Sequence, residues 1–233
     1  MKAFLLAAGL GTRLRPLTDT VPKCMLTIDG TPLIDIWLDR MAAAGVDEVT
    51  VNLHHLAEVV QDHVARRIGP PLVRTVLEPE LLGSAGTLLA NRDWVAQESS
   101  FLVCYADNLT DYDLGLLVEA HRSSGRPATI ALFKAPDPRA CGIVETGPDG
   151  VVTAFEEKPA QPRSDTANAG IYAFDPSVLD LVEGPAPKDI GYDLLPHLVG
   201  RAGTVVVDAY LLDIGTPAAY ERAQREWRER TRP

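Results

Sequence analysis

The sequence has few cysteines, with three among 233 residues. Cys24, Cys104 and Cys141 lie far apart and lack the spacing of metal ligands, so we expect reduced thiols in a cytoplasmic protein. Apolar runs long enough to span a membrane are missing. The N-terminus leads directly into a strand pattern, so we expect no signal peptide. A membrane partner is therefore not expected.

Basic residues are also scarce, because 22 Lys and Arg stand against 32 Asp and Glu and the net charge is -10. A protein this acidic lacks the basic surface that non-specific binding to nucleic acid requires. Basic residues that do gather in a cleft are therefore expected to bind a small anion. Hydrophobic residues make up 46% of the chain, enough for one large domain around a single core.

Strand and helix patterns alternate through the first 135 residues or so. Strands are predicted at 3–8, 46–53, 72–78, 101–108 and 128–135, and helices at 32–44, 56–64, 85–95 and 113–121. The first helix has Thr31 as its expected N-cap and Pro32 as its first residue. Such alternation predicts a mostly parallel sheet with helices on both faces.

The second part of the chain has shorter strand patterns separated by Pro- and Gly-rich turns. Strands are predicted at 141–146, 151–159, 169–175 and 204–215, a helical stretch at 191–195 before Pro196, and a last helix from Thr216–Pro217 with Tyr220, Ala223 and Trp227 on its inner face. The charged tail 225–233 is expected to fray. We therefore predict a single α/β domain, with a mostly parallel, Rossmann-like open sheet and a small β-rich lid.

The stretch "LLAAGLGTRLRP" (5–16) places a glycine-rich turn directly after the first predicted strand. Ligands bind beyond the carboxyl ends of such strands, where glycines let the backbone approach closely and exposed amides can cradle an anion. Arg13 and Arg15 add forked donors that suit phosphate. Leu14 replaces the third glycine of the dinucleotide fingerprint, and the Walker lysine is missing. The loop is predicted to hold a phosphate chain, the alternative being a plain turn with solvated arginines.

This stretch, continued to Lys23, resembles the signature of sugar-1-phosphate nucleotidyltransferases. Further segments resemble the later motifs of that family in the right order: "EPELLGSAGTL" (78–88), "YADN" (105–108), "CGIVE" (141–145), "FEEKP" (155–159), "NAGIY" (168–172) and "LLDIGTP" (211–217). The resemblance implies a GT-A-like nucleotidyltransferase fold with a nucleotide-binding part (1–135) and a sugar-phosphate-binding part with the C-terminal helix (136–233). It also implies an enzyme that uses a nucleoside triphosphate, a sugar 1-phosphate and Mg²⁺ to make a nucleotide sugar.

Site residues follow from the same resemblance. It implies catalytic roles for Arg13, Lys23 and Asp107, nucleotide binding by Ala7, Ala8, Gly9, Leu10, Gly11, Thr12, Arg13, Glu78, Leu82, Gly83, Ser84 and Thr87, sugar-phosphate binding by Asp107, Gly142, Glu157, Lys158 and Asn168, and metal binding by Asp107 and Asp213. Carboxylates at the ends of two apolar strands are typical of Mg²⁺ sites, although an aspartate at a strand end often only forms a turn.

Several alternatives stay open. The 78–88 segment favours GTP with mannose or heptose 1-phosphate, and the alternatives are uridylyl or thymidylyl transfer to another hexose 1-phosphate or a non-catalytic nucleotide-sugar sensor. A nicotinamide-dependent oxidoreductase is excluded by the missing third glycine. Because the sequence ends soon after residue 217, we expect no appended domain. Both a monomer and a homo-oligomer are compatible with this sequence.

Overall fold

The computed structural model describes residues 1–231, and most of their strands join one central sheet. Nine described strands form it, in the order β10-β9-β11-β6-β1-β4-β5, with β8 beside β11 and β12 beside β8. These strands are β1 (Lys2–Leu6), β4 (Glu48–Leu53), β5 (Leu72–Leu77), β6 (Phe101–Tyr105), β8 (Ala128–Lys134), β9 (Gly142–Thr146), β10 (Val152–Glu157), β11 (Thr166–Phe174) and β12 (Gly203–Val206). Strands β6, β1, β4 and β5 are mutually parallel, as the alternating pattern predicted.

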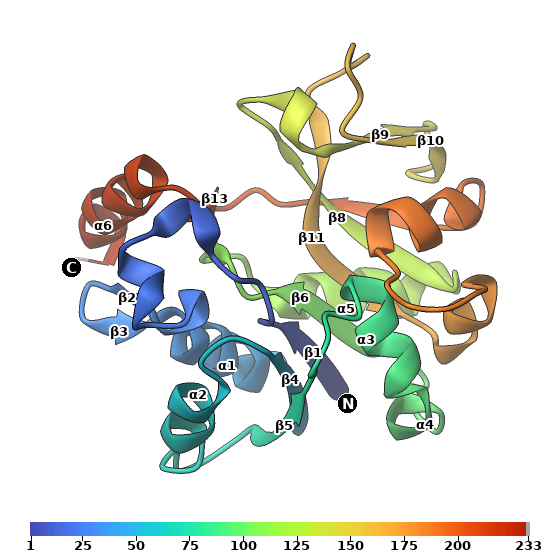
Figure 1. Ribbon diagram of the computed structural model, residues 1–233. Helices are drawn as coiled ribbons and strands as arrows, with labels where there is room; N and C mark the ends of the chain where they lie inside the picture. The colour runs from blue at the N-terminus through green and yellow to red at the C-terminus, as the bar shows by residue number, and fades with distance from the viewer. Residues whose placement is uncertain (232–233) are drawn as a thin grey trace.

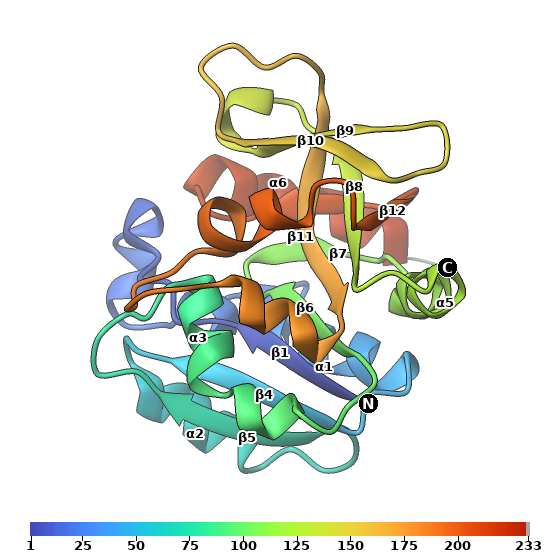
Figure 2. The same ribbon diagram turned by 90° about the vertical axis from the view of Figure 1, so that its right-hand side faces the viewer.

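Helices cover both faces of this sheet (Figures 1 and 2). They are α1 (Leu33–Ala43), α2 (Ala57–Val64), α3 (Ser84–Ala90), α4 (Arg92–Val95), α5 (Leu114–Ser124) and α6 (Pro217–Thr231). One core cluster packs α1, α2, α5 and α6 against the sheet, and a second packs α3 and α4 against the opposite face. Strand β1 contributes to both clusters. Ala3 and Leu5 belong to the first cluster, and Phe4 and Leu6 belong to the second. This double burial explains its continuous apolar sequence.

Strand β11 links the central sheet to the β-rich extension. Its residues 171–174 pair antiparallel with β6, whereas Ala167 pairs with Ile143 of β9. The register against β8 shifts between Asn168 and Tyr172, so the strand changes course there. As a result the β9–β10 hairpin stands above the parallel part of the sheet (Figure 1). The predicted fold, one α/β sheet with a small β-rich lid, is confirmed.

Two predicted strands are each divided in the structure. The expected strand 101–108 separates into β6 and β7 (Asn108–Thr110), and the expected strand 204–215 into β12 and β13 (Leu211–Asp213). The reason is a change of partner, because β12 pairs with β8 in the central sheet and β13 pairs with β7 in a separate ribbon. The first strand also ends at Leu6 rather than at residue 8, so Ala7 and Ala8 begin the loop.

Predicted helix boundaries also needed correction. Thr31 and Pro32 form strand β3, paired with β2 (Thr27–Ile28), because Asp29 and Gly30 both have positive φ and make a tight hairpin turn. The expected helix 85–95 breaks at Asn91, whose side chain donates to the Thr87 carbonyl (2.9 Å). The stretch before Pro196 is a π-helix over Ile190–Leu194, followed by a 3₁₀ turn.

The C-terminal helix begins as expected, with the Thr216 hydroxyl accepting the amide of Ala219 (3.2 Å). Ala223 and Trp227 are buried on its inner face. The tail 225–233 was expected to fray, but residues 225–231 are helical as the end of α6, and residues 232–233 lie outside the described residues. None of the described helices is long and apolar enough to cross a membrane.

Candidate active site

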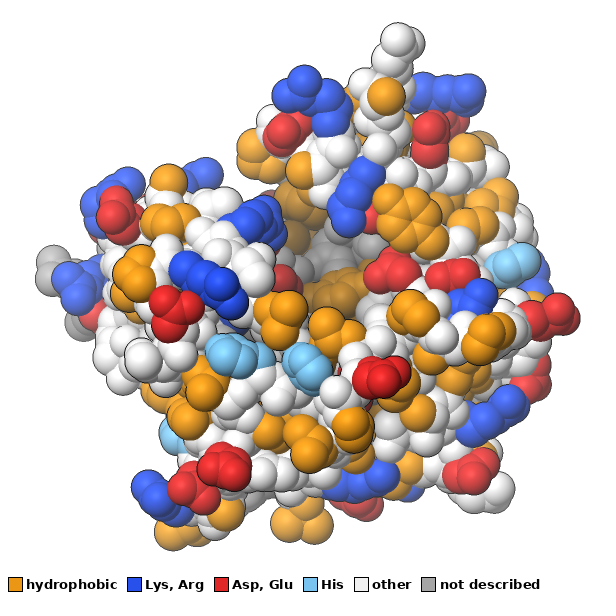
Figure 3. All heavy atoms as spheres, viewed as in Figure 1, with side chains coloured by type: hydrophobic (Ala, Val, Ile, Leu, Met, Phe, Trp, Pro, Cys, Tyr) orange, Lys and Arg blue, Asp and Glu red, His pale blue; other side chains and the backbone are white. Residues whose placement is uncertain are grey.

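Two cavities meet at the carboxyl ends of the parallel strands. A cavity of about 300 Å³ lies beside the loop after β1, and a larger one of about 590 Å³ extends toward the β9–β10 hairpin. Tyr105, Asp107 and Asp189 line both. Figure 3 shows the surface hollowed here, with basic side chains on opposite rims of the cleft. The position agrees with the rule that open α/β sheets bind ligands beyond their strand ends.

The loop after β1 is held by its own backbone. Gly11 has a φ of +62°, and its carbonyl accepts the Leu14 amide (2.9 Å) and the Thr18 hydroxyl (2.8 Å). A Cβ at Gly11 would lie 2.9 Å from the Thr18 methyl carbon, so the position requires glycine. Within residues 1–231, the amides of Leu10 and Gly11 donate to no protein acceptor. They are therefore available to a bound anion.

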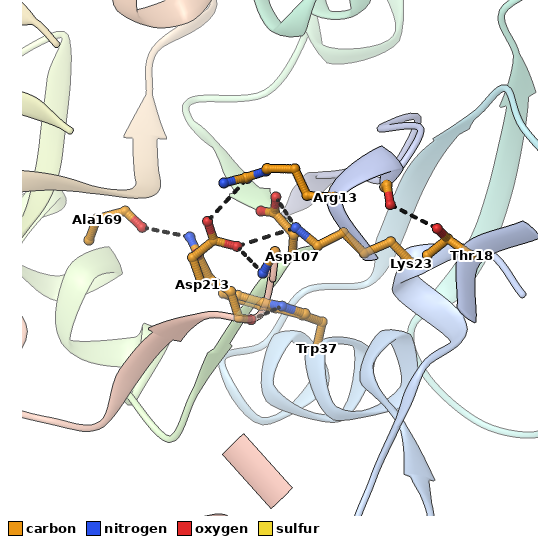
Figure 4. Close-up of polar contacts among 10 residues, drawn as sticks. Arg13, Thr18, Lys23, Trp37, Asp107, Ala169 and Asp213 are labelled. Carbon is orange, nitrogen blue, oxygen red and sulfur yellow. Dashed lines mark hydrogen bonds and ion pairs between the residues drawn. The ribbon is translucent and has the colours of Figure 1, made fainter. Parts of the chain in front are cut away.

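Four charged side chains converge where the cavities meet (Figure 4). The buried Lys23 Nζ donates to Asp107 Oδ2 (2.8 Å) and Asp213 Oδ1 (3.2 Å). Arg13 lies across from the same aspartate, with its Nη2 3.8 Å from Asp213 Oδ2. The lysine side chain is only 9% exposed, whereas the other three side chains are 42% to 67% exposed. A buried ammonium thus sits between two partly exposed carboxylates.

The β7–β13 ribbon brings the two carboxylates together. Asp213 pairs with Asn108 across it, and the amide of Ile214 donates to the carbonyl of Asp107 (3.1 Å). Asp213 Oδ1 also accepts the Gly215 amide (2.7 Å). Asp213 therefore both forms a turn and contributes to the charged cluster. The two interpretations of this residue, as a turn former and as a metal ligand, are compatible.

This donor set fits a divalent cation. Both carboxylates already lie within hydrogen-bonding distance of one positive group, which shows that they can act on a single cation. Mg²⁺ is usually held by one or two carboxylates together with phosphate oxygens. In the part of the chain that the structure describes, no group of three or more acidic, histidine or cysteine side chains is placed so that it could hold a metal ion. The remaining ligands would therefore come from phosphate and water.

The wall of the smaller cavity contains the start of α3. Gly83 has a φ of +77°, and a Cβ there would lie 2.3 Å from the carbonyl oxygen of Lys188. That carbonyl accepts the amide of Ala85 (2.9 Å), and the Ser84 hydroxyl donates to Asp189 Oδ2 (2.8 Å). The segment around residue 189 thus binds to this wall although it comes from the second half of the chain.

Glu157 and Lys158 dominate the opposite wall. Added Cβ atoms at Gly142 and Gly191 would lie 2.4 and 2.5 Å from Glu157 Oε2, so both glycines make room for this carboxylate. Burial raises the pKa of Glu157, an effect that Lys158 opposes and Asp189 reinforces. The Lys158 Nζ lies 3.4 Å from Glu157 Oε1, and its side chain is 54% exposed. Asn168 donates to the Tyr172 hydroxyl (2.6 Å).

The structure brings together most of the residues singled out from the sequence. Ala7, Ala8, Gly9, Lys23, Glu78, Gly83, Ser84 and Asp107 line the smaller cavity; Arg13, Asp107, Gly142, Glu157, Lys158, Asn168 and Asp213 line the larger one. The linings do not include Leu10, Gly11, Thr12, Leu82 and Thr87. Arg15 pairs instead with Asp19 (3.2 Å).

The lining residues that were not predicted include three with polar side chains, Asn52, Tyr105 and Asp189. Asn52 carries a recognisable signal, because an amide at the end of the apolar strand "VTVNL" has to find partners. Asp189 caps the π-helix through Gly191 and Tyr192. Its place in the site depends on a fold contact between distant segments, which local sequence does not encode.

Fold and site together define an α/β protein with a glycine-rich loop beside two carboxylates at the ends of its strands. The family model for nucleotidyl transferases matches residues 2–230. The chain therefore belongs to the nucleotidyl transferase family.

Individual relatives agree with this assignment. The chain is 35% identical over 97% of its length to a UTP–glucose-1-phosphate uridylyltransferase of Synechocystis sp. and 33% identical over 94% to a mannose-1-phosphate guanyltransferase of Schizosaccharomyces pombe. It spans 63% and 62% of the lengths of these two relatives. Its fold matches a UDP-glucose pyrophosphorylase from Acinetobacter baumanii with a TM-score of 0.85 at 22% identity, covering 97% of this chain and 92% of that one.

Proposed function

We propose that this protein transfers a nucleotidyl group from a nucleoside triphosphate to a sugar 1-phosphate, giving a nucleotide sugar and pyrophosphate. The observation that carries the proposal is the cluster of Arg13, Lys23, Asp107 and Asp213 at the junction of two cavities. The loop beside one cavity has two amides that no acceptor in the described residues uses, and Lys158 lines the other cavity, so a separate anion-binding group lies next to each. Two phosphorylated substrates could therefore meet at this junction.

The residues on the two walls have different roles in the proposed reaction. The amides of Leu10 and Gly11, with Arg13, bind the β- and γ-phosphates and stabilise the charge on the leaving pyrophosphate. Lys158 holds the phosphate of the sugar so that one of its oxygens attacks the α-phosphorus opposite the leaving group. Lys23 contacts phosphate oxygens of either substrate at the junction. Reactions of this kind depend on positioning and charge stabilisation and need no covalent protein intermediate.

Asp107 and Asp213 are proposed to hold Mg²⁺, which when bound neutralises charge on the phosphate oxygens. Glu157 is proposed to accept hydrogen bonds from sugar hydroxyls, together with the amide of Gly142 and the side chain of Asn168. Asp107 also lines the cavity proposed for the sugar phosphate and so belongs to both sets. The proposed partners are these small molecules, and the proposed compartment is the cytoplasm.

GTP with mannose or heptose 1-phosphate is the proposed substrate pair. The segment 78–88 supports it, as do relatives named guanyltransferases, whereas a uridylyltransferase of similar identity supports the alternative base. A non-catalytic sensor is less favoured, because Arg13, Lys23, Asp107 and Asp213 are all present and in contact.

A substrate panel tests the proposal. The protein is incubated with Mg²⁺, each of four nucleoside triphosphates and the 1-phosphates of mannose, heptose and glucose, while pyrophosphate is measured. We expect release only when both substrates are present, with the highest kcat/KM for GTP and mannose or heptose 1-phosphate. A preference for UTP or dTTP would favour the alternative base. Nucleotide binding without pyrophosphate from any pair would favour the sensor.

A further inference from the structure

Asn52 lies at the carboxyl end of β4, between the two segments that form the nucleotide-side wall. We propose that Asn52 is a positioning residue, which holds the loop 7–11 and the segment 78–87 in a fixed relation to each other. This inference rests on the proposed function, because it assigns a role within that same site. The side chain is 5% exposed and lines the smaller cavity.

The first contact determines where β1 leaves the sheet. Leu6 is the last residue of β1 that pairs with β4, and its partner in the register is Asn52. The next amide along the chain, Ala7 N, donates to Asn52 Oδ1 (2.7 Å). A side-chain oxygen therefore takes the place of the next backbone acceptor, and the chain turns away into the loop at Ala7.

The second contact reaches the other segment. Asn52 Nδ2 donates to Glu78 Oε1 (2.9 Å) and Thr87 Oγ1 (3.0 Å). Glu78 also accepts the Thr87 hydroxyl at Oε1 (2.5 Å) and the Leu82 amide at Oε2 (3.2 Å). The buried Glu78 carboxylate thus accepts three internal hydrogen bonds. One amide side chain connects both segments through this network.

Loss of the amide would leave Ala7 N without its acceptor and would remove one of the two donors to Glu78 Oε1, the other being the Thr87 hydroxyl. A buried polar group that loses its partner bears its full desolvation cost, so the loop or the segment must move or admit water. The loop amides would then be misaligned for phosphate. The wall with Glu157 and Lys158 comes from other elements and shares none of these contacts.

The first test compares Asn52→Leu with Thr50→Val. Thr50 lies two residues earlier on the same face of β4, is buried, and its hydroxyl has no partner among the described residues. We expect Asn52→Leu to weaken GTP binding in calorimetry about 10- to 100-fold, the scale of one lost hydrogen bond to a charged group. The KM for sugar phosphate should stay within about 3-fold, and Thr50→Val should change GTP affinity less than about 2-fold. Hydrogen exchange at the Ala7 amide should accelerate in Asn52→Leu only.

The second test exchanges the two polar groups and covers the case in which Asn52→Leu fails to fold. Asn52→Asp alone places two carboxylates together and should weaken GTP binding. The double variant Asn52→Asp/Glu78→Gln restores one donor between positions 52 and 78 and keeps an acceptor for Ala7 N. It should recover GTP affinity to within about 5-fold of the unmodified protein, because the hydrogen-bonding pattern is restored.

Either of two results would overturn the inference: a folded Asn52→Leu protein with unchanged GTP affinity, or a double variant no better than Asn52→Asp. A protein that binds GTP but releases pyrophosphate from no pair of substrates would refute the proposed function and leave the test of Asn52 intact. Absence of any nucleotide binding would refute both.

Discussion

The two walls of the cleft are built differently. On the wall proposed to bind the nucleotide, Asn52, Glu78 and Thr87 are buried and hydrogen-bonded to one another, and Ser84 donates to Asp189. On the opposite wall, Lys158 is more than half exposed, and its ammonium contacts only the neighbouring Glu157 among the described residues. The first wall is therefore preorganised by internal hydrogen bonds, whereas the second presents a charge that lacks a strong partner.

This difference implies that the binding of one substrate depends on the other substrate more strongly at the second wall than at the first. A preorganised wall loses little conformational freedom when a ligand binds, whereas an exposed lysine must be ordered by the ligand itself. We therefore expect the nucleotide to bind well on its own and the sugar phosphate to bind well only when its partner substrate is present. The four variants below either break this contrast or sharpen it.

The largest effect is expected at Asp107, because it lines both cavities and contacts Lys23. Asp107→Asn should lower kcat by about 10²–10³, since charge next to a transferring phosphate is a large contribution to catalysis. Chelation of Mg²⁺ should abolish turnover of the unmodified protein. Asp93→Asn, at an exposed aspartate of α4, serves as the control. Full activity in excess chelator would contradict the assignment of Asp107 and Asp213 to a metal.

The two arginines of the loop provide the next comparison. Arg13 faces Asp213 in the cleft, whereas Arg15 pairs with Asp19 outside it. Arg13→Ala should reduce kcat about 10- to 100-fold and nucleotide affinity less, because its charge acts mainly on the leaving group. Arg15→Ala should stay within about 3-fold on both measures. Small and equal effects would mean that the loop only attracts anions.

Lys158→Ala tests the contrast directly. Removal of this charge should raise the KM for the sugar phosphate about 10-fold and lower kcat, because the attacking phosphate is no longer aimed. GTP affinity measured by calorimetry without sugar should stay within a few-fold. The reverse pattern, with lost GTP binding and an unchanged KM, would show that the two substrates have been placed on the wrong walls.

The residues that could be predicted from the sequence are those that lie in local motifs, and the others depend on contacts between distant segments. The loop and Asp107 were predicted because each follows an apolar strand, and strand ends are where parallel sheets bind ligands. Lys23 was predicted because it completes the family signature that begins in that loop. The contact of Ser84 with Asp189 joins residues 105 positions apart, so no local pattern could reveal it. The role of Asn52 depends on the register of β1 against β4, which is also set by the fold.

Element boundaries failed for related reasons. The strand predicted over 204–215 is mostly apolar apart from Asp208, but β12 and β13 pair with different partners and the chain must bend between them. The hairpin at Asp29–Gly30 did carry a local signal, since Asp-Gly favours a tight turn with positive φ at both residues. The helical pattern after Thr31 outweighed that signal. The first boundary was therefore set by tertiary pairing. The second was mispredicted because the turn signal of Asp29–Gly30 was overlooked.

The smallest effect is expected from Glu157→Gln, measured as stability against pH. Burial raises the pKa of Glu157 above its ordinary value of 4.5, so the folded state disfavours the ionised carboxyl. The stability that its neutral form provides is complete below about pH 4.5 and is lost as the pH rises through the folded-state pKa. Glutamine never ionises and should avoid that loss. The variant should therefore match the unmodified protein at acid pH and melt a few degrees higher at pH 8, the scale on which about 1 kcal/mol moves the melting temperature of a chain of this size.

Glu156→Gln is the matched control, because the neighbouring carboxylate is exposed. Its melting temperature should follow that of the unmodified protein at every pH. Glu157→Gln should also shift the preference among sugar 1-phosphates more than the preference among bases, since an amide accepts hydrogen bonds from hydroxyls less strongly than a carboxylate. A melting temperature for Glu157→Gln that falls relative to the unmodified protein as the pH rises would mean that the Lys158 contact outweighs burial. The second wall would then be stabilised by its ion pair before any sugar phosphate binds, and the contrast between the two walls would fail.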